Sequence, residues 1–328
     1  RPPAAPPAKA LVKVFAFHRD EAALLGDWLY WHSTVFGAEN LVVVDHKSTD
    51  PDVLELLDAY ARRGASVVPF SGGFGEKAEA LSAAMRAAAN TADFLVPVDV
   101  DEFLVLERGD AIAADPAAIL DEFRNLPPAE PRKFKFSMRV AACPGGDDAS
   151  PDAARPAVVR SFSPPTQKAM AKTFFRGGYG FLSTDQGNHF GLTRYDNASS
   201  QDAMRSNGHF DRFYFRTRLT LLHFSMPDFQ TWHKKLFQRA KAYGFSMKSQ
   251  CEGVRRGQRY CWSFQKLRGG DAPLDVARTE YADVCGAIAA QQRETGGRRQ
   301  GLQRGDLGGL ADVLLAHDPV GPRRRVAR

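Results

Sequence analysis

The chain has 328 residues, of which 44% are hydrophobic and 25% are charged, and these ordinary fractions exclude wholesale disorder. The length accommodates either two average domains or one large α/β domain. The net charge of +6 suits a polyanionic partner, which could be a nucleic acid, a membrane surface or a diphosphate.

The first ten residues are rich in proline and alanine, which predicts an extended linker over residues 1–10. A segment removed upstream, such as a stalk after a membrane anchor, and a trimmed sequence are equally compatible with this start. The compartment is therefore open. We expect the Golgi lumen, after removal of an anchor, for a eukaryotic chain, and a cytoplasmic or membrane-associated location for a bacterial one.

Strand and helix signals alternate over the first hundred residues. Short β-rich apolar runs are typical of buried strands, whereas apolar residues at helical spacing indicate amphipathic helices. Strands are expected at residues 11–17, 41–44, 65–69 and 94–98, with helices at 21–36, 50–63 and 76–89 between them. Strands separated by helices predict right-handed crossovers, and therefore an α/β fold with a mostly parallel central sheet flanked by helices.

The second half is less regular. The expected elements are a capped helix at 115–125, a strand at 133–140, a surface insertion at 143–156, a strand at 219–224 and a helix at 228–243. Clustered arginines near the end predict a basic extension over residues 251–328. The predicted organisation is a linker, one large domain over residues 11–250 and this extension.

The four cysteines include no pair with the Cys-x-x-Cys spacing of a zinc site. Cys251 and Cys261 are close enough in sequence to form a disulfide in an oxidising compartment. Asn197 begins an Asn-x-Ser triplet, a glycosylation pattern that is also common by chance.

Polar side chains follow three of the expected strands. Arg19, Asp45 and Asp99 each come shortly after a strand. In open α/β sheets, ligands bind outside the carboxyl ends of the strands. The sequence therefore predicts a site along one edge of the sheet.

The acidic run at residues 99–102 (Asp-Val-Asp-Glu) directly follows the strand at 94–98. Three neighbouring carboxylates repel one another unless a cation binds to them, and hard oxygen ligands suit Mg²⁺ or Mn²⁺. The alternative is a solvated acidic turn, because turns favour aspartate.

Four stretches carry a resemblance to a known family. They are His18-Arg19-Asp20-Glu21 with Trp28, Trp31 and His32; Val44 to Asp50; Val98 to Phe103; and His223-Phe224 with Lys235. Together they resemble glycosyltransferases with the GT-A (Rossmann-like) fold, and more narrowly the glycosyltransferase 2-like and family 92 (DUF23-type) group. The resemblance covers residues 11–245 and implies a nucleotide-sugar-binding half at 11–110 and an acceptor half at 111–250.

The resemblance implies a hexosyltransferase-type enzyme that uses Mn²⁺ or Mg²⁺. The donor would be a nucleotide diphosphate sugar, expected to be a UDP-sugar, and the acceptor a glycan or another hydroxyl group, with inversion. The implied metal ligands are Asp99, Asp101 and His223. Residues expected to bind the nucleotide or substrate are Arg19, Glu21, Asp45, Asp99, Lys172, His189 and Lys235.

An inverting transfer needs a carboxylate base that takes the proton of the acceptor hydroxyl. Asp185, in the polar loop 184–189, is the candidate, and Glu102 is the rival, expected instead to support the metal site from behind. His189 in the same loop would orient the acceptor or the diphosphate. The alternative for this loop is an Asx-type turn without a catalytic role.

Two other functions stay open. A sugar nucleotidyltransferase would use a similar sheet and metal, but it needs a glycine-rich phosphate loop early in the chain, and residues 17–21 contain no glycine. A non-catalytic carbohydrate-binding module with a glycosyltransferase-like fold is the other alternative. The sequence contains no recognised nucleic-acid-binding motif.

Overall fold

The computed structural model describes residues 9–109, 111–128, 132–141, 143, 172–196, 214–225, 229–242, 245–252, 258–267 and 271–294. Most of the expected linker, most of the expected insertion at 143–156, Asn197 and the arginine-rich end of the chain lie outside the described residues. No helix in the described part is long and apolar enough to span a membrane.

The centre of the molecule is a nine-stranded sheet in the order β3-β2-β1-β4-β8-β7-β11-β5-β6. Its strands are β1 (Ala10–His18), β2 (Leu41–Asp45), β3 (Ser66–Pro69), β4 (Ala92–Pro97), β5 (Glu102–Arg108), β6 (Ala111–Ala113), β7 (Lys133–Val140), β8 (Thr173–Arg176) and β11 (Phe215–His223). The pairings from strand to strand give β5 and β8 one direction and the other strands the opposite one. The predicted α/β fold with a mostly parallel central sheet is confirmed.

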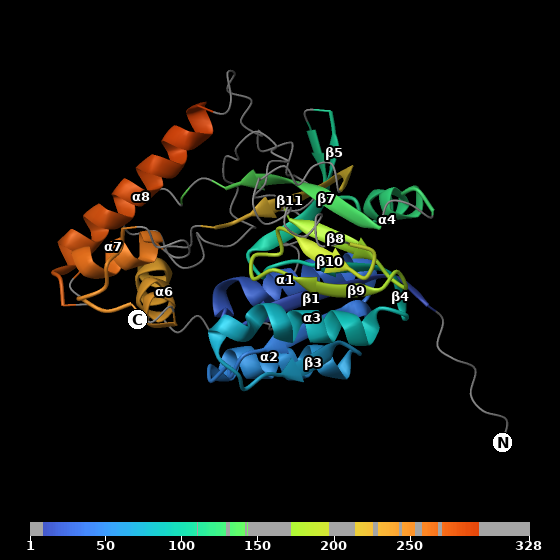
Figure 1. Cartoon of the computed structure of the whole chain (residues 1–328), viewed down its shortest axis with the longest axis horizontal. Coiled ribbons are helices and arrows are strands. Elements are labelled where there is room, and N and C mark those ends of the chain that lie inside the picture. Colours follow the sequence, from blue (N-terminus) through green and yellow to red (C-terminus); the bar gives the residue numbers. More distant parts are fainter. Residues whose placement is uncertain are drawn as a thin grey trace, which may run out of the picture.

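Helices flank this sheet on both faces (Figure 1). The flanking helices are α1 (Ala22–Phe36), α2 (Pro51–Arg62), α3 (Lys77–Ala88) and α4 (Pro116–Arg124). Three further helices follow β11, namely α6 (Phe229–Ala242), α7 (Gln258–Lys266) and α8 (Leu274–Glu294). The carboxylates of Asp50 and Asp115 accept backbone N–H groups at the starts of α2 and α4, and a proline follows each cap. Both predicted helix starts are therefore confirmed.

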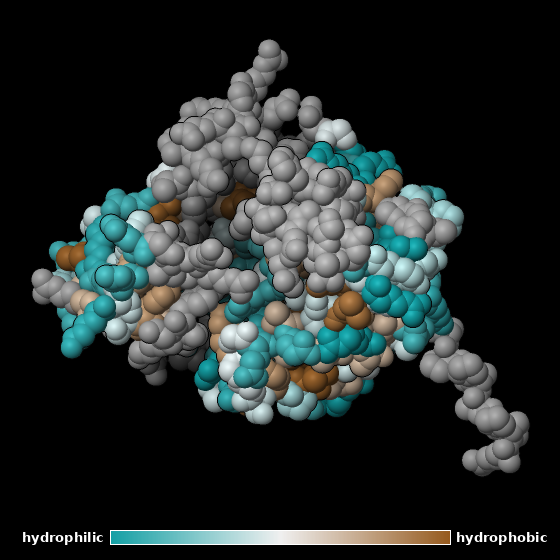
Figure 2. Space-filling view, viewed as in Figure 1, coloured by the Kyte–Doolittle hydropathy of each residue, from teal (hydrophilic) through white to brown (hydrophobic). Residues whose placement is uncertain are grey.

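Two hydrophobic clusters fill the two faces of the sheet. Alternate residues of a strand point to opposite faces, so Val14 and Ala16 of β1 join the cluster shared with α1, α2 and α4, whereas Phe15 and Phe17 join the cluster beneath α3. On the face that Figure 2 shows, apolar patches are small and separated by hydrophilic surface. The two clusters therefore pack helices against both faces of β1.

A third cluster joins the helices after β11. Phe229, Trp232 and Leu236 of α6 pack against Ala277 and Tyr281 of α8. A disulfide between Cys143 and Cys285 ties α8 to the end of β7, and the expected Cys251–Cys261 disulfide is present. The helices α6, α7 and α8 lie to one side of the sheet in Figure 1. The predicted domain boundary at residue 250 falls within this helical unit and stays a prediction.

Candidate functional site

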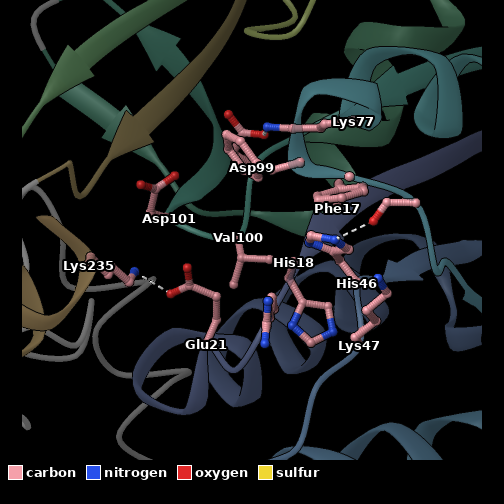
Figure 3. A pocket seen from close by; sticks show the side chains of 14 residues that line it. Phe17, His18, Glu21, His46, Lys47, Lys77, Asp99, Val100, Asp101 and Lys235 are labelled. Atoms are coloured by element: carbon pink, nitrogen blue, oxygen red, sulfur yellow. Dashed lines mark hydrogen bonds and ion pairs between the residues drawn. The ribbon is translucent and has the colours of Figure 1, made fainter. Parts of the chain in front are cut away.

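A pocket of about 590 Å³ lies where β1, β2 and β4 end. The expectation that the residues after these strands share one edge is confirmed, because Arg19 and Asp99 both line this pocket and Asp45 is the register partner of His18. The lining residues are Phe17, His18, Arg19, Glu21, His46, Lys47, Gly72, Gly73, Phe74, Lys77, Asp99, Val100, Asp101 and Lys235 (Figure 3).

The carboxylate of Asp99 is held by two lysines. Its Oδ1 accepts a hydrogen bond from Lys77 Nζ at 2.9 Å, and its Oδ2 accepts one from Lys172 Nζ at 2.6 Å. The side-chain amide of Asn188 adds a longer contact to Oδ1 at 3.4 Å. Burial alone would raise the pKa of Asp99, but the two ammonium groups hold it well below its usual range. Asp99 is therefore an ionised carboxylate that is already neutralised by protein cations.

Asp101 faces a histidine instead. His223, the last residue of β11, places its Nε2 3.6 Å from Asp101 Oδ2. Burial raises the pKa of Asp101, but the imidazole outweighs this effect and lowers the pKa to about 2. Both side chains remain about one-fifth exposed, and Asp101 also lines the pocket. The sequence motif 99–102 thus divides into one carboxylate paired with lysines and one paired with a histidine.

Glu102 lies behind this pair and is completely buried. Its Oε2 accepts the backbone N–H of Asp99 at 2.9 Å, and its Oε1 lies 3.2 Å from Lys172 Nζ. Burial raises the pKa of Glu102, whereas Lys172 opposes that shift. Glu102 does not line the pocket, and its expected supporting role at a metal site stays a prediction.

His18 and Asp45 form a second buried pair at the same edge. His18 Nε2 lies 3.4 Å from Asp45 Oδ1, and the His18 side chain is fully shielded. Neither ring nitrogen of His18 has a hydrogen-bond partner among the described residues. Burial lowers the pKa of His18, and Asp45 opposes that shift. Buried polar atoms without a partner are uncommon in folded proteins, and these atoms lie at the edge that forms the pocket.

Glu21 and Lys235 join the start of α1 to α6 at the pocket. Lys235 on α6 donates a hydrogen bond to Glu21 Oε2, next to the start of α1 (Figure 3). Arg19 is half-exposed on the same wall, with its Nε 3.7 Å from Asp20 Oδ2. The structure therefore brings three predicted nucleotide-binding residues, Arg19, Glu21 and Lys235, into one pocket.

The loop that contains Asp185 and His189 joins β9 (Phe181–Thr184) to β10 (Gly191–Thr193). Asp185 Oδ1 accepts the N–H groups of His189 and Phe190 at 2.6 and 3.1 Å, and its Oδ2 accepts that of Gly187 at 3.3 Å. This is the Asx-type turn of the alternative interpretation. Asp185 does not line the pocket, although Asn188 of the same turn reaches Asp99.

His189 carries an imidazole that is neutral near pH 7. Burial, together with the nearby ammonium of Lys172, lowers its pKa to about 4. Its Nδ1 has no hydrogen-bond partner among the described residues. The loop therefore approaches the cluster of Asp99 and Lys172, but the structure leaves the catalytic assignment of Asp185 a prediction.

The residues fit a divalent cation only in part. Within the described ranges, no three His, Cys, Asp or Glu side chains form a group that could hold a metal ion. Asp101, which lines the pocket, and its partner His223 could provide one oxygen and one nitrogen ligand. Both oxygens of Asp99 are taken up by lysines, so this geometry does not support its predicted metal role. Beside this pair, the part of the chain that the structure describes supplies no third His, Cys, Asp or Glu ligand.

Sequence reasoning missed Lys77, His18 and Asn188. The sequence around Lys77 could have indicated a ligand-binding role, because Lys77 begins a helix shortly after the glycine-containing segment 72–75. His18 belongs to the His-Arg-Asp-Glu motif, but a single sequence cannot reveal that both of its ring nitrogens lack hydrogen-bond partners among the described residues. Asn188 reaches Asp99 only through the β9–β10 turn, which no local pattern connects to β4.

A scan of family models finds no match and a search of curated proteins finds none, so the family 92 grouping is not confirmed. Among solved structures, TarS from S. aureus is 13% identical, with a TM-score of 0.32, over 83% of this chain and 55% of that chain. This chain thus spans about half the length of TarS.

Two further solved structures match this chain with similarly low sequence identities and TM-scores. The mannosyltransferase PcManGT from Pyrobaculum calidifontis, in complex with GDP-Man and Mn²⁺, is 14% identical over 94% of this chain and 86% of that chain, with a TM-score of 0.35. A cytidylyltransferase from Leptospira borgpetersenii is 12% identical over 72% and 88%, with a TM-score of 0.32. Because these TM-scores stay below 0.5, the residues of the site itself must carry the functional conclusion.

Proposed function

We propose that this chain is a metal-dependent glycosyltransferase. It moves a sugar from a nucleotide diphosphate sugar, a UDP-sugar, to a glycan or another hydroxyl acceptor with inversion. The observation that carries the proposal is one pocket lined by four cations, Arg19, Lys47, Lys77 and Lys235, and by Asp101, whose partner is His223. Such a pocket suits a ligand with several phosphate charges.

The chemistry needs charge compensation at the leaving group. When the glycosidic bond breaks, the departing diphosphate gains negative charge, and groups placed in advance to receive that charge lower the barrier. Mn²⁺ or Mg²⁺ held by Asp101 and His223 would act there as a Lewis acid. Arg19 and Lys235 supply fixed positive charge on the pocket wall that α1 and α6 share.

The polar edge at the ends of β1 and β2 suits the nucleoside. Next to this part of the pocket, His18 and Asp45 carry buried hydrogen-bonding atoms without partners among the described residues. Phe17 and His46 line the same part of the pocket with ring surface. The expected nucleotide-binding role of Asp45 is thus consistent with its position.

Asp185 is the candidate base for the acceptor hydroxyl. Its Oδ2 has one long contact, to Gly187 N–H at 3.3 Å, so it keeps capacity to accept a proton. The rival Glu102 is completely buried, and its two oxygens face Lys172 and the Asp99 N–H. Of the two carboxylates, Asp185 is the one that is not completely buried, so we keep it as the candidate.

A sugar nucleotidyltransferase is the second candidate, favoured by the glycines on the pocket wall. Gly72 and Gly73 line the pocket, and the backbone carbonyl of Gly72 accepts a hydrogen bond from His46 Nε2 at 2.9 Å. The segment follows the third strand of the chain rather than the first, which argues for the transferase. Incubation with UTP and a sugar 1-phosphate separates the two functions, because only the nucleotidyltransferase releases pyrophosphate.

The paired cysteines support an oxidising compartment for this domain. All four cysteines of the sequence are in disulfides, Cys143–Cys285 and Cys251–Cys261. Disulfides persist in secretory and extracytoplasmic compartments and are rare in the cytosol. Of the compartments expected from the sequence, this favours a lumenal location over a cytoplasmic one.

The proposed function is tested by ligand binding followed by turnover. Thermal-shift measurements with UDP, GDP, CDP and ADP, each with and without Mn²⁺, should show the largest stabilisation with UDP plus Mn²⁺. UDP-sugar hydrolysis should then depend on Mn²⁺. A protein that no nucleoside diphosphate stabilises, and that hydrolyses no nucleotide sugar, would contradict the proposal.

A further inference from the structure

Lys77 is a pocket cation whose bonding capacity is only partly used. It is the first residue of α3, its side chain is 12% exposed, and it lines the pocket beside Phe17 and Asp99 (Figure 3). Among the described residues its ammonium group has one hydrogen-bond partner, Asp99 Oδ1 at 2.9 Å. An ammonium group has three N–H donors, so further donors are available to a ligand while the contact to Asp99 is kept.

The second lysine on Asp99 is placed differently. Lys172 is 4% exposed at its side chain, does not line the pocket, and bridges Asp99 Oδ2 and Glu102 Oε1 at 2.6 and 3.2 Å. A buried carboxylate that loses its counter-ion is strongly destabilised. Because Lys172 remains in place, Asp99 stays neutralised when Lys77 shares its charge with an anion in the pocket.

We propose that Lys77 binds the diphosphate of the nucleotide donor, and that Asp99 positions Lys77 instead of ligating the metal. The inference rests on the proposed function, because it names one contact within that donor site. Lys77 reaches the pocket from α3, whereas Lys235 reaches it from α6, on a different element of the fold. The diphosphate is thus contacted by cations from both α3 and α6, in addition to any metal ion held by Asp101 and His223.

The test compares UDP with uridine, since only UDP carries the diphosphate. Calorimetric titrations in the presence of Mn²⁺ would use the wild type, Lys77→Gln, Lys77→Arg and the control Lys248→Gln, which removes an exposed lysine outside the pocket. We expect Lys77→Gln to weaken UDP binding by about 10- to 100-fold, the range for a hydrogen bond to a charged group, and to leave uridine binding unchanged. Lys77→Arg should retain most of the UDP affinity, and Lys248→Gln all of it.

The outcomes separate this inference from the proposed function. Wild-type protein that binds none of UDP, GDP, CDP and ADP overturns both. Wild-type protein that binds UDP while Lys77→Gln keeps its affinity, or loses uridine and UDP to the same extent, overturns the role of Lys77 alone. Equal losses in Lys77→Arg and Lys77→Gln would also overturn it, because the effect would then follow side-chain shape rather than charge.

Discussion

Asp101 and His223 face each other across the junction of β5 and β11, with 3.6 Å between Oδ2 and Nε2. Antiparallel pairing of the two strands places His223 opposite Glu102, and the backbone N–H of Phe224 donates to the carbonyl of Asp101 at 2.7 Å. The sheet itself therefore fixes the separation of the two side chains. Asp101 is the pocket carboxylate of the acidic motif that remains available to a cation, because the other one, Asp99, is bound by lysines.

The Asp101–His223 pair predicts the effect of metal. Asp101→Asn or His223→Gln should remove the stimulation of UDP-sugar hydrolysis by Mn²⁺, because each change removes one of two protein ligands. We expect a loss of about 100-fold or more in kcat/KM, since a Lewis acid at the leaving group contributes several kcal/mol. The exposed carboxylate Glu55 provides a matched control as Glu55→Gln. A full Mn²⁺ response in Asp101→Asn would contradict the assignment.

Asp185 allows its turn and its proposed catalytic role to be separated. In Asp185→Asn the retained Oδ1 can still accept the N–H groups of His189 and Phe190, but the side chain cannot take a proton. We expect a Tm close to that of the wild type and a kcat lower by about 100-fold or more, the contribution of a general base. Asp185→Ala should lose stability as well. An unchanged kcat in Asp185→Asn would leave Asp185 as a turn residue only.

His32 predicts acid-sensitive stability. It is completely buried in α1, with its Nδ1 2.9 Å from the carbonyl oxygen of Trp28. Burial lowers its pKa from 6.5 to about 3, and the hydrogen bond to Trp28 only partly opposes that shift. Between these values the unfolded chain binds a proton that the folded chain does not. The free energy of unfolding therefore falls as the pH drops from 6.5 towards 3, by up to about 1.4 kcal/mol per pH unit from this group.

Replacing His32 tests this titration directly. His32→Phe keeps an aromatic ring among Trp28, Phe36 and Phe103 and removes the ionisable group. We expect the Tm difference between about pH 7 and about pH 5 to be smaller in the variant than in the wild type. Calorimetric scans at several pH values measure it. The same pH dependence in both proteins would show that other groups dominate acid unfolding.

The two disulfides should differ in their contribution to stability. Cys143–Cys285 closes a separation of 142 residues, whereas Cys251–Cys261 closes one of 10. In the chain-entropy model the first contributes about 5 kcal/mol and the second about 3 kcal/mol. The variant Cys143→Ser/Cys285→Ser should therefore have a lower denaturant midpoint than Cys251→Ser/Cys261→Ser. Because α8 packs on α6, which carries Lys235, the first variant should also bind UDP more weakly.

Equal midpoints of the two double variants would contradict the entropic ranking. A first variant that is destabilised and yet binds UDP with unchanged affinity would show that the disulfide does not hold Lys235 at the pocket. Far-UV circular dichroism on both variants establishes whether the remainder of the fold is retained.

Local patterns in the sequence were sufficient for the framework. The apolar run at 41–44 and the strand-like segment at 133–140 are strands, and the Asp-Pro pairs at 50–51 and 115–116 start helices, since these signals depend on residues within a few positions of one another. The alternation of strands and helices then implies a parallel sheet with its ligand edge after β1, β2 and β4. Arg19, Asp45 and Asp99 could be placed on that edge without a structure.

The partners of those residues depended on tertiary structure. Lys172 reaches Asp99 because β8 pairs with β4 and β7, and His223 reaches Asp101 because β11 pairs with β5. Pairings between strands so far apart in the chain leave no local periodicity in one sequence. Sequence alone therefore identified an acidic cluster that needs a counter-charge, but only the fold decided that lysines neutralise Asp99 while a histidine faces Asp101.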